Sequence, residues 1–374
     1  MIRSFLFLFV AGLFLGGMCY TFTLDETFVT LRYADNLANG YGAVFNFGER
    51  VEGFFSPLWV LLLALLSFLP GDLVLYAKAL SFAFYLGVGA YLLKMIQREG
   101  GSLSLTTIFY LLSFPLILWG VSGLESSLYA LLYLMLFNYT TQIKKMSGWK
   151  LGVLLIAILL TRPEAIPICL ISLAVYLTKK RISVKFMTYF VISVVTLLLV
   201  RINYFGDLLP HVFYAKQFNS PKILSLLFIH YFLGYFMGPG FIFALLGVVC
   251  WKWMKPHRVY LMILFVAGHL LPYVYSGGDG LTAWRIFVPV IPIFILMINS
   301  LLSEAKKNWN PLTTSAAFSL FIFLYFVGNI SLLRQYSLTH WKVPTLASIR
   351  GHVDNGNPNF EKVATWLNHN KKYR

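Results

Sequence analysis

The stretch that decides the fold is FTLDETFVTLRYADNLANGYGAVFNFGERVEGFFSPLW, Phe22 to Trp59, which follows the first apolar segment of the chain. It concentrates charge in a sequence that is otherwise mostly hydrophobic, through Asp25, Glu26, Arg32, Asp35, Glu49, Arg50 and Glu52. Such a concentration directly after an apolar run indicates a place where the chain leaves a hydrophobic environment for water. The rest of the sequence shows what kind of environment that is.

The composition places the chain outside the range of soluble domains. Of its 374 residues 59% are hydrophobic, 17% aromatic and 12% charged, and the mean hydropathy is +0.74. Soluble domains carry about 25% charged residues. We therefore predict an all-α polytopic membrane protein. The net charge of +16 does not indicate a nucleic-acid partner, because much of the Lys and Arg lies in short runs between apolar segments, a pattern that sets membrane topology.

A helix needs about 20 apolar residues to cross the bilayer core, and on this basis we expect about eleven spans. They are 4–23, 72–94, 104–121, 126–143, 149–162, 164–178, 185–201, 239–254, 259–275, 286–302 and 312–333. The apolar segments 54–69 and 222–237 are expected to lie in the outer interface as juxtamembrane helices. Only that arrangement places every Lys/Arg cluster on the cytoplasmic side.

The carboxylates give a partly independent check on this topology. All Asp and Glu residues except Glu99 and Glu304 fall on the outer side. We therefore expect a transmembrane module over residues 1–333, with outer loops at 24–71 and 202–238, and a short polar outer tail at 334–374. The first segment lacks an A-x-A cleavage site and is expected to be a retained helix.

The acid pair at the end of the first span has two interpretations. Asp25 could be the N-cap of an interfacial helix, which satisfies a backbone N–H group. A cap needs only one acid, however, and leaves Glu26 unexplained. The other interpretation is a carboxylate at the water boundary that accepts a proton from an incoming hydroxyl group.

Two further outer segments place charge at the mouths of spans. VSGLESSLYA contains Glu125, and LLTRPEAIP contains Arg162 and Glu164. Charges at this depth usually face a cavity or a partner. A structural Arg162–Glu164 pair that closes the hairpin is the alternative.

The segments VRINYFGDLLPHVFYAK and SGGDGLTAWRIFVPVIP carry the remaining candidates. The first contains Asp207, Tyr214 and Lys216, and the second contains Asp279 among glycines and Arg285 just before a span. An Arg at this level suits a phosphate group, by charge and by its planar donors. The alternative is a glycine-rich turn followed by an Arg that snorkels to the lipid head groups.

Metal and nucleotide motifs are absent from the sequence. Walker, HExxH and CxxC patterns do not occur, and the three cysteines lie singly in apolar runs. We predict no metal site and no cofactor, with dependence on a divalent ion left open.

An acid pair after the first helix, then RYADNLANGYGAVFNFGERVEGFFSPLW, SGLESSLYALL, TRPEA, YFGDLLPHVFYAK and GGDGLTAWRIFVPVIP, occur in this order. The set resembles the GT-C superfamily of polyprenyl-phosphate-sugar-dependent glycosyltransferases, and within it the terminal arabinofuranosyltransferase-like branch. The resemblance extends from about residue 20 to residue 300. Many of these relatives continue into a soluble domain after the last span, whereas this chain stops soon after FEKVATWLNHN.

The resemblance implies a role for each motif. Asp25 would be the catalytic base, with Glu26 beside it as in the acid pair of protein O-mannosyltransferases, and Arg285 and Arg162 would hold the donor phosphate. The substrate pocket would be lined by Arg32, Glu125, Glu164, Asp207, Tyr214, Lys216 and Asp279.

The expected function is sugar transfer from a polyprenyl-phosphate donor to a hydroxyl group of a glycan, lipid or protein, at the outer (periplasmic) face of a bacterial inner membrane. A secondary transporter or glycolipid flippase is the rival, because polar groups in a many-span protein often line a substrate path. A non-catalytic assembly protein is a third possibility. The sugar, the acceptor and the stereochemistry of the linkage stay open.

Overall fold

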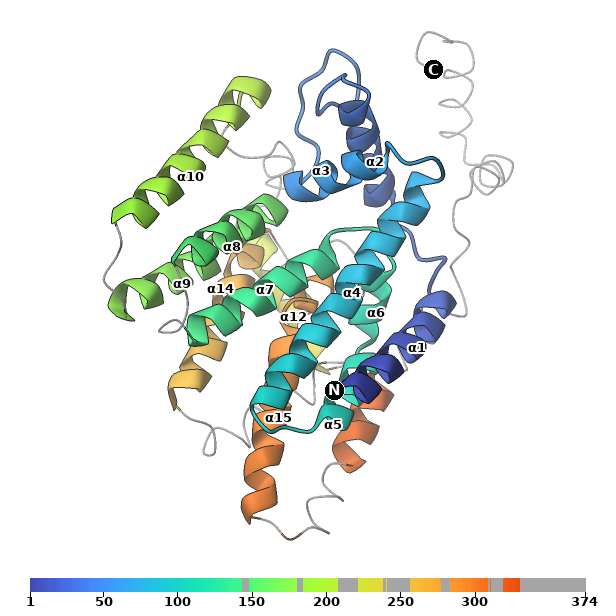
Figure 1. Cartoon of the computed structure of the whole chain (residues 1–374), viewed down its shortest axis with the longest axis vertical. Coiled ribbons are helices and arrows are strands. Elements are labelled where there is room, and N and C mark those ends of the chain that lie inside the picture. Colours follow the sequence, from blue (N-terminus) through green and yellow to red (C-terminus); the bar gives the residue numbers. More distant parts are fainter. Residues whose placement is uncertain are drawn as a thin grey trace.

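The computed structural model describes residues 1–142, 148–179, 184–207, 221–237, 240, 256–276, 283–308, 310 and 319–329. Within these ranges all regular structure is helical and no β-strand occurs (Figure 1). The predicted all-α class is confirmed for this part of the chain. The predicted tail 334–374 and the predicted span 239–254 lie outside it, apart from residue 240.

The helices follow one another in chain order. They are α1 (Ile2–Met18), α2 (Asp25–Ala38), α3 (Pro57–Leu66), α4 (Leu73–Arg98), α5 (Leu103–Leu111), α6 (Phe114–Gly120), α7 (Ser126–Thr141), α8 (Gly148–Thr161), η2 (Pro163–Ala165), α9 (Ile166–Lys179), α10 (Val184–Phe205), α12 (Pro221–Met237), α14 (Pro256–Ser276), η3 (Arg285–Phe287) and α15 (Ile291–Asn308). A further apolar helix covers Ser319–Asn329.

Most expected spans coincide with a helix, but few of these helices, as described, are long and apolar enough to cross a membrane. In the described residues only α4 is by itself long and apolar enough to cross a membrane, and α5 with α6 would make a second span if the two count as one. The other apolar helices are shorter. The helices described here therefore do not show the eleven spans.

The expected continuous span 104–121 is wrong in one respect, because it is broken into α5 and α6. The two helices meet at an angle of 67°. Pro115 lies at the start of α6. In an unbroken helix it would remove the backbone bond to Leu111 and clash with that turn. All seven residues of α6 are buried, so this helix lies inside the bundle.

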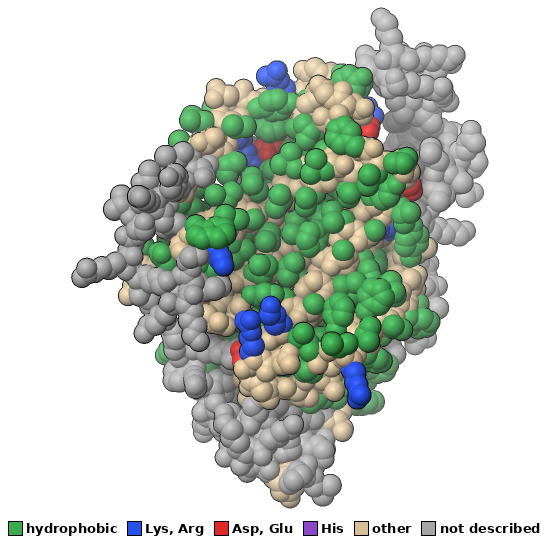
Figure 2. All heavy atoms as spheres, viewed as in Figure 1, with side chains coloured by type: hydrophobic (Ala, Val, Ile, Leu, Met, Phe, Trp, Pro, Cys, Tyr) green, Lys and Arg blue, Asp and Glu red, His purple; other side chains and the backbone are tan. Residues whose placement is uncertain are grey.

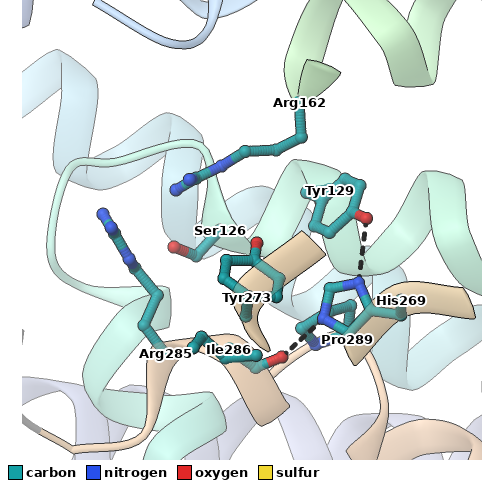
Figure 3. A pocket seen from close by; sticks show the side chains of 8 residues that line it. All are labelled: Ser126, Tyr129, Arg162, His269, Tyr273, Arg285, Ile286 and Pro289. Carbon is teal, nitrogen blue, oxygen red and sulfur yellow. Dashed lines mark hydrogen bonds between the residues drawn. The ribbon is translucent and has the colours of Figure 1, made fainter. Parts of the chain in front are cut away.

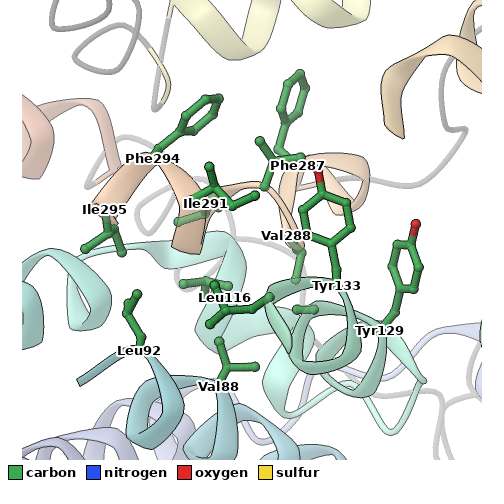
Figure 4. Close-up of a cluster of buried hydrophobic side chains, with 14 of the residues drawn as sticks. Val88, Leu92, Leu116, Tyr129, Tyr133, Phe287, Val288, Ile291, Phe294 and Ile295 are labelled. Carbon is green, nitrogen blue, oxygen red and sulfur yellow. The ribbon is translucent and has the colours of Figure 1, made fainter. Parts of the chain in front are cut away.

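The main core forms where α4, α6, α7 and the η3–α15 segment meet. The helix α4 packs against α7 along its length, α1 packs against α4 and α5, and α14 packs against α9 and α12. Figure 4 shows the centre of this core, where residues of α4, α6, α7 and the η3–α15 segment come together. Among the side chains drawn there are Val88, Leu116, Tyr133 and Ile291, all buried.

The segment 24–71 forms a folded cap at one end of the bundle (Figure 1). Its helices α2 and α3 pack on each other and share a second hydrophobic cluster with the start of α4. The Tyr33 hydroxyl donates to Val51 O (2.8 Å) and accepts from Gly53 N (3.0 Å). Burial raises the pKa of Tyr33, so the hydroxyl keeps its proton. An ion pair of 2.6 Å between Glu52 and Arg201 attaches the cap to α10.

The outer surface is rich in apolar side chains. Figure 2 shows a face on which hydrophobic side chains predominate and charged ones are few. The exposed large hydrophobic residues of α1 include Leu6, Phe7, Val10, Leu13 and Phe14. Soluble monomers rarely expose apolar patches of this extent.

Candidate functional site

A small pocket lies where the start of α7, the α8–η2 junction, α14 and η3 meet (Figure 3). Four sequence-distant segments therefore contribute to it. Its lining consists of Ser126, Tyr129, Arg162, His269, Tyr273, Arg285, Ile286 and Pro289.

The segment that leads into α7 is held by hydrogen bonds from the cap. The Thr27 hydroxyl in α2 donates to Ser122 O (3.1 Å), and the Trp59 indole in α3 donates to Gly123 O (3.1 Å). Gly123 has a φ of +81°, and a Cβ atom there would lie 3.0 Å from the Thr27 methyl group. The SGLES motif thus needs its glycine where the cap and the bundle touch, and it delivers Glu125 and Ser126 to the pocket.

Arg162 forms an ion pair that is sealed from water. Its guanidinium contacts the Glu125 carboxylate, and the exposed fractions of the two side chains are 6% and 7%. Glu164 is a more distant neighbour, with 4.0 Å between the nearest atoms. The expected alternative, a pair of Arg162 with Glu164, is therefore secondary to the pair with Glu125, which we call the sealed pair.

Arg285 forms an ion pair of a different kind. Its Nη1 atom lies 2.8 Å from Glu26 Oε2, and its side chain is 7% exposed while that of Glu26 is 47% exposed. We call this the open pair. The guanidinium carbon of Arg285 also lies 5.4 Å from the centre of the Trp119 ring, a cation–π geometry.

The backbone before Arg285 takes a conformation that non-glycine residues rarely adopt. Ala283 and Trp284 have φ angles of 57° and 49°, in the left-handed region. The Trp119 indole donates to Ala283 O at 3.1 Å and holds this turn. Strained positions of this kind persist only where the surroundings fix them, and they cluster at functional sites.

His269 holds the other side of Arg285. Its Nε2 lies 2.7 Å from Ile286 O and its Nδ1 lies 3.1 Å from the Tyr129 hydroxyl. A carbonyl oxygen only accepts, so Nε2 carries the hydrogen and Nδ1 accepts from Tyr129. Neither His269 nor Tyr129 was among the predicted site residues. A histidine inside the apolar segment 259–275 was the signal that could have found the first.

Ser126 is the uncharged polar group beside the arginines. The guanidinium ends of Arg162 and Arg285 point toward the same region, and the Ser126 hydroxyl lies beside them (Figure 3). This hydroxyl is buried, and no hydrogen-bond partner for it occurs among the described residues. Two guanidinium groups and a hydroxyl at the first turn of a helix form an arrangement that suits an anion such as phosphate.

The acid pair lies in the first turn of α2, but Asp25 is not its N-cap. The N-cap is Leu24, and no side chain caps the helix. The capping interpretation of Asp25 is therefore wrong. Glu26 reaches Arg285, whereas Asp25 is exposed and has no partner within the described part of the chain.

The other predicted site residues divide into those brought to the pocket and those not. Glu125 and Glu164 lie at Arg162, behind the lining. Arg32 lies on the exposed side of α2, where its Nε is 3.4 Å from Phe45 O, and it does not line this pocket. Asp207 follows α10 and does not line the pocket either. The predicted residues Tyr214, Lys216 and Asp279 lie outside the described residues.

Metal ligands do not gather in the described ranges, where no group of three or more His, Cys, Asp or Glu residues could hold an ion. Comparison with models of protein families, with curated proteins and with solved structures found no match to this chain. The family resemblance consequently rests on the sequence motifs alone.

Proposed function

We propose that the protein is a multi-pass GT-C-like glycosyltransferase of a bacterial inner membrane. It would move a sugar from a polyprenyl-phosphate donor to a hydroxyl group on the outer face. The observation that carries this proposal is the convergence of Arg162 and Arg285 on one pocket, with the acid pair of α2 attached to it through Glu26. Buried guanidinium groups favour a phosphate, and nearby carboxylates supply a base.

The residues take distinct roles in this reaction. The Asp25 carboxylate accepts the proton of the acceptor hydroxyl while the hydroxyl oxygen bonds to the anomeric carbon of the sugar. The bond from that carbon to the phosphate oxygen breaks, and the polyprenyl phosphate leaves with the electron pair. Arg285 and Arg162 stabilise the negative charge on this leaving group. Electrostatic stabilisation of this kind is strongest where water is excluded. Asp25 suits the role of base because its carboxylate is exposed and no described residue pairs with it, whether or not Glu26 holds Arg285.

The surface of the chain supports a membrane setting for this chemistry. Apolar side chains are exposed along α1, α3 and α10. A lipid-borne donor approaches from within the bilayer, so its phosphate reaches a protein at the level of the head groups. The cap formed by α2 and α3 lies at one end of the bundle (Figure 1), and its Glu26 pairs with the pocket residue Arg285.

The experiment that tests the proposal is sugar transfer by the purified protein in lipid, with a panel of radiolabelled polyprenyl-phosphate sugars. Asp25→Asn is the test variant. Asp35→Asn is its matched control, since Asp35 is an exposed acid on the same helix whose side chain contacts only Asn39 among the described residues.

Transfer from one donor that is lost in Asp25→Asn and kept in Asp35→Asn would support the proposal. Equal turnover in wild type and Asp25→Asn would remove Asp25 as the base. Movement of lipid or solute across the bilayer without transfer from any donor would establish the transporter instead.

A further inference from the structure

Arg285 and Glu26 differ in how firmly they are held. The guanidinium of Arg285 lies over Trp119, and the next residue, Ile286, is bound through its carbonyl by His269. The ring of Phe287 stacks on the buried Tyr235 of α12 with 3.7 Å between ring centres. These contacts fix the arginine on three sides.

Glu26 has no comparable support for its carboxylate. The residue lies in the first turn of α2, and nearly half of its side chain is exposed. The hydrogen bond from the Thr30 hydroxyl, of 2.9 Å, goes to the Glu26 backbone oxygen and leaves the carboxylate free to rotate. If the pair opens, water can solvate the carboxylate, whereas the arginine stays in place.

Ion pairs between exposed groups are weak, about 0–1 kcal/mol, and the exposure of Glu26 moves its pair with Arg285 toward that range. A phosphate group offers Arg285 the same planar, charge-assisted contact as a carboxylate, with more charge and more acceptor oxygens. The exchange of the Glu26 carboxylate for a phosphate group at Arg285 therefore costs little free energy.

We infer that Glu26 is an internal competitor for the donor phosphate, bound to Arg285 through its carboxylate and exchanged for the phosphate when the donor binds. This inference rests on the proposed function, because it assumes that the pocket takes a phosphate. Donor binding then releases a carboxylate next to Asp25, so the acid pair is complete only when the donor is in place. Occupation of the pocket by the donor and release of the Glu26 carboxylate next to Asp25 are coupled in this way.

The test measures binding of a polyprenyl monophosphate to the purified full chain in discs of phosphatidylcholine, with the corresponding polyprenol as the uncharged probe. Glu26→Gln removes the competing charge. Glu26→Asp keeps the charge but shortens the side chain by about 1.5 Å, one carbon–carbon bond, so the contact is lost. Asp35→Asn is the matched control, because it removes an exposed charge from the same helix without touching Arg285.

We expect both Glu26 variants to bind the monophosphate about three- to tenfold more tightly than wild type, which corresponds to the loss of one weak ion pair. Asp35→Asn should bind it as wild type does. Polyprenol binding should be the same in all four proteins.

Three results would overturn the inference. Asp35→Asn could tighten binding as much as Glu26→Gln, which would make the effect a general charge effect. Glu26→Asp could bind as wild type does, or neither Glu26 variant could bind more tightly. Tighter binding in both Glu26 variants without any sugar transfer would leave the inference intact and reject the proposed transferase, so the two failures are distinguishable.

Discussion

The sealed pair and the open pair each join one arginine to one glutamate, but the two glutamates differ in their exposure to water. Arg162 and Arg285 are equally buried, with side chains 6% and 7% exposed. Their partners differ, since Glu125 is 7% exposed and Glu26 is 47% exposed. The exposed fraction of the partner, rather than that of the arginine, decides whether an ion pair can be opened.

This difference assigns the two arginines different tasks at one pocket. Breaking the sealed pair leaves a charge in a place that water does not reach, so the pair fixes the junction between α7 and η2. Opening the open pair returns Glu26 to water, and an incoming anion can take its place at the buried Arg285. We therefore expect variants of the first pair to change stability and variants of the second to change ligand binding.

The largest effect should follow from Glu125→Gln. It leaves the Arg162 charge buried without its main partner, which typically costs about 3–5 kcal/mol. Thermal unfolding of the purified protein in detergent, followed by tryptophan fluorescence, measures the loss. Replacement of both Glu125 and Arg162 by methionine should recover most of the stability, because the sealed pair is then replaced as a whole by apolar side chains. A Glu125→Gln variant as stable as wild type would contradict the assignment of a sealed pair.

A smaller loss of stability is expected for Thr27→Val. This variant tests the contact between α2, which carries Glu26, and the segment that carries Glu125. Valine keeps the shape of the buried side chain but leaves Ser122 O without the Thr27 hydroxyl, which costs about 1–3 kcal/mol. The same unfolding measurement applies. Thr23→Val, a change of the same kind at a half-buried position just before α2, is the control. No difference between the two variants would mean that the contact between α2 and the SGLES segment does not stabilise the fold.

For Arg285→Met we expect a stability loss of about 1 kcal/mol or less from the broken ion pair, because Glu26 becomes hydrated in place of its partner. The comparison with Glu125→Gln under identical conditions is the informative one. If Arg285→Met lost as much stability as Glu125→Gln, the two pairs would not differ as proposed.

The smallest effect should come from Glu164→Gln. Glu164 lies 4.0 Å from Arg162, at the limit of an ion pair, so its removal should change the free energy of unfolding by about 0.5 kcal/mol or less. A denaturation midpoint shifted as far as that of Glu125→Gln would show that Glu164 is the principal partner after all.

Much of the fold and part of the pocket could be predicted from the sequence. Length and apolarity located most helices, and the composition gave the all-α class. Arg162 and Arg285 were predicted to share one ligand, and they do line one pocket. The break at Pro115 had a local signal, since a proline inside an expected span ends or bends the helix.

What the sequence did not predict depends on packing between distant segments. The nearer partner of Arg162 is Glu125, from a different helix junction, while the neighbouring Glu164 lies 4.0 Å away. Sequence proximity favoured the more distant acid, because it contains no information on how α7 lies against η2. Tyr129 and His269 meet across the bundle, and their roles follow only from the hydrogen bond of each to its neighbour.

The most direct test of the central claim compares polyprenyl monophosphate binding in wild type and Arg285→Met, in lipid discs at fixed ionic strength. A charge-assisted hydrogen bond is worth about 1.5–3 kcal/mol, so we expect Arg285→Met to bind the monophosphate at least about tenfold more weakly. Binding of the uncharged polyprenol should not change. Equal monophosphate affinity in the two proteins would contradict the account, because Arg285 would then not be the group that takes the phosphate.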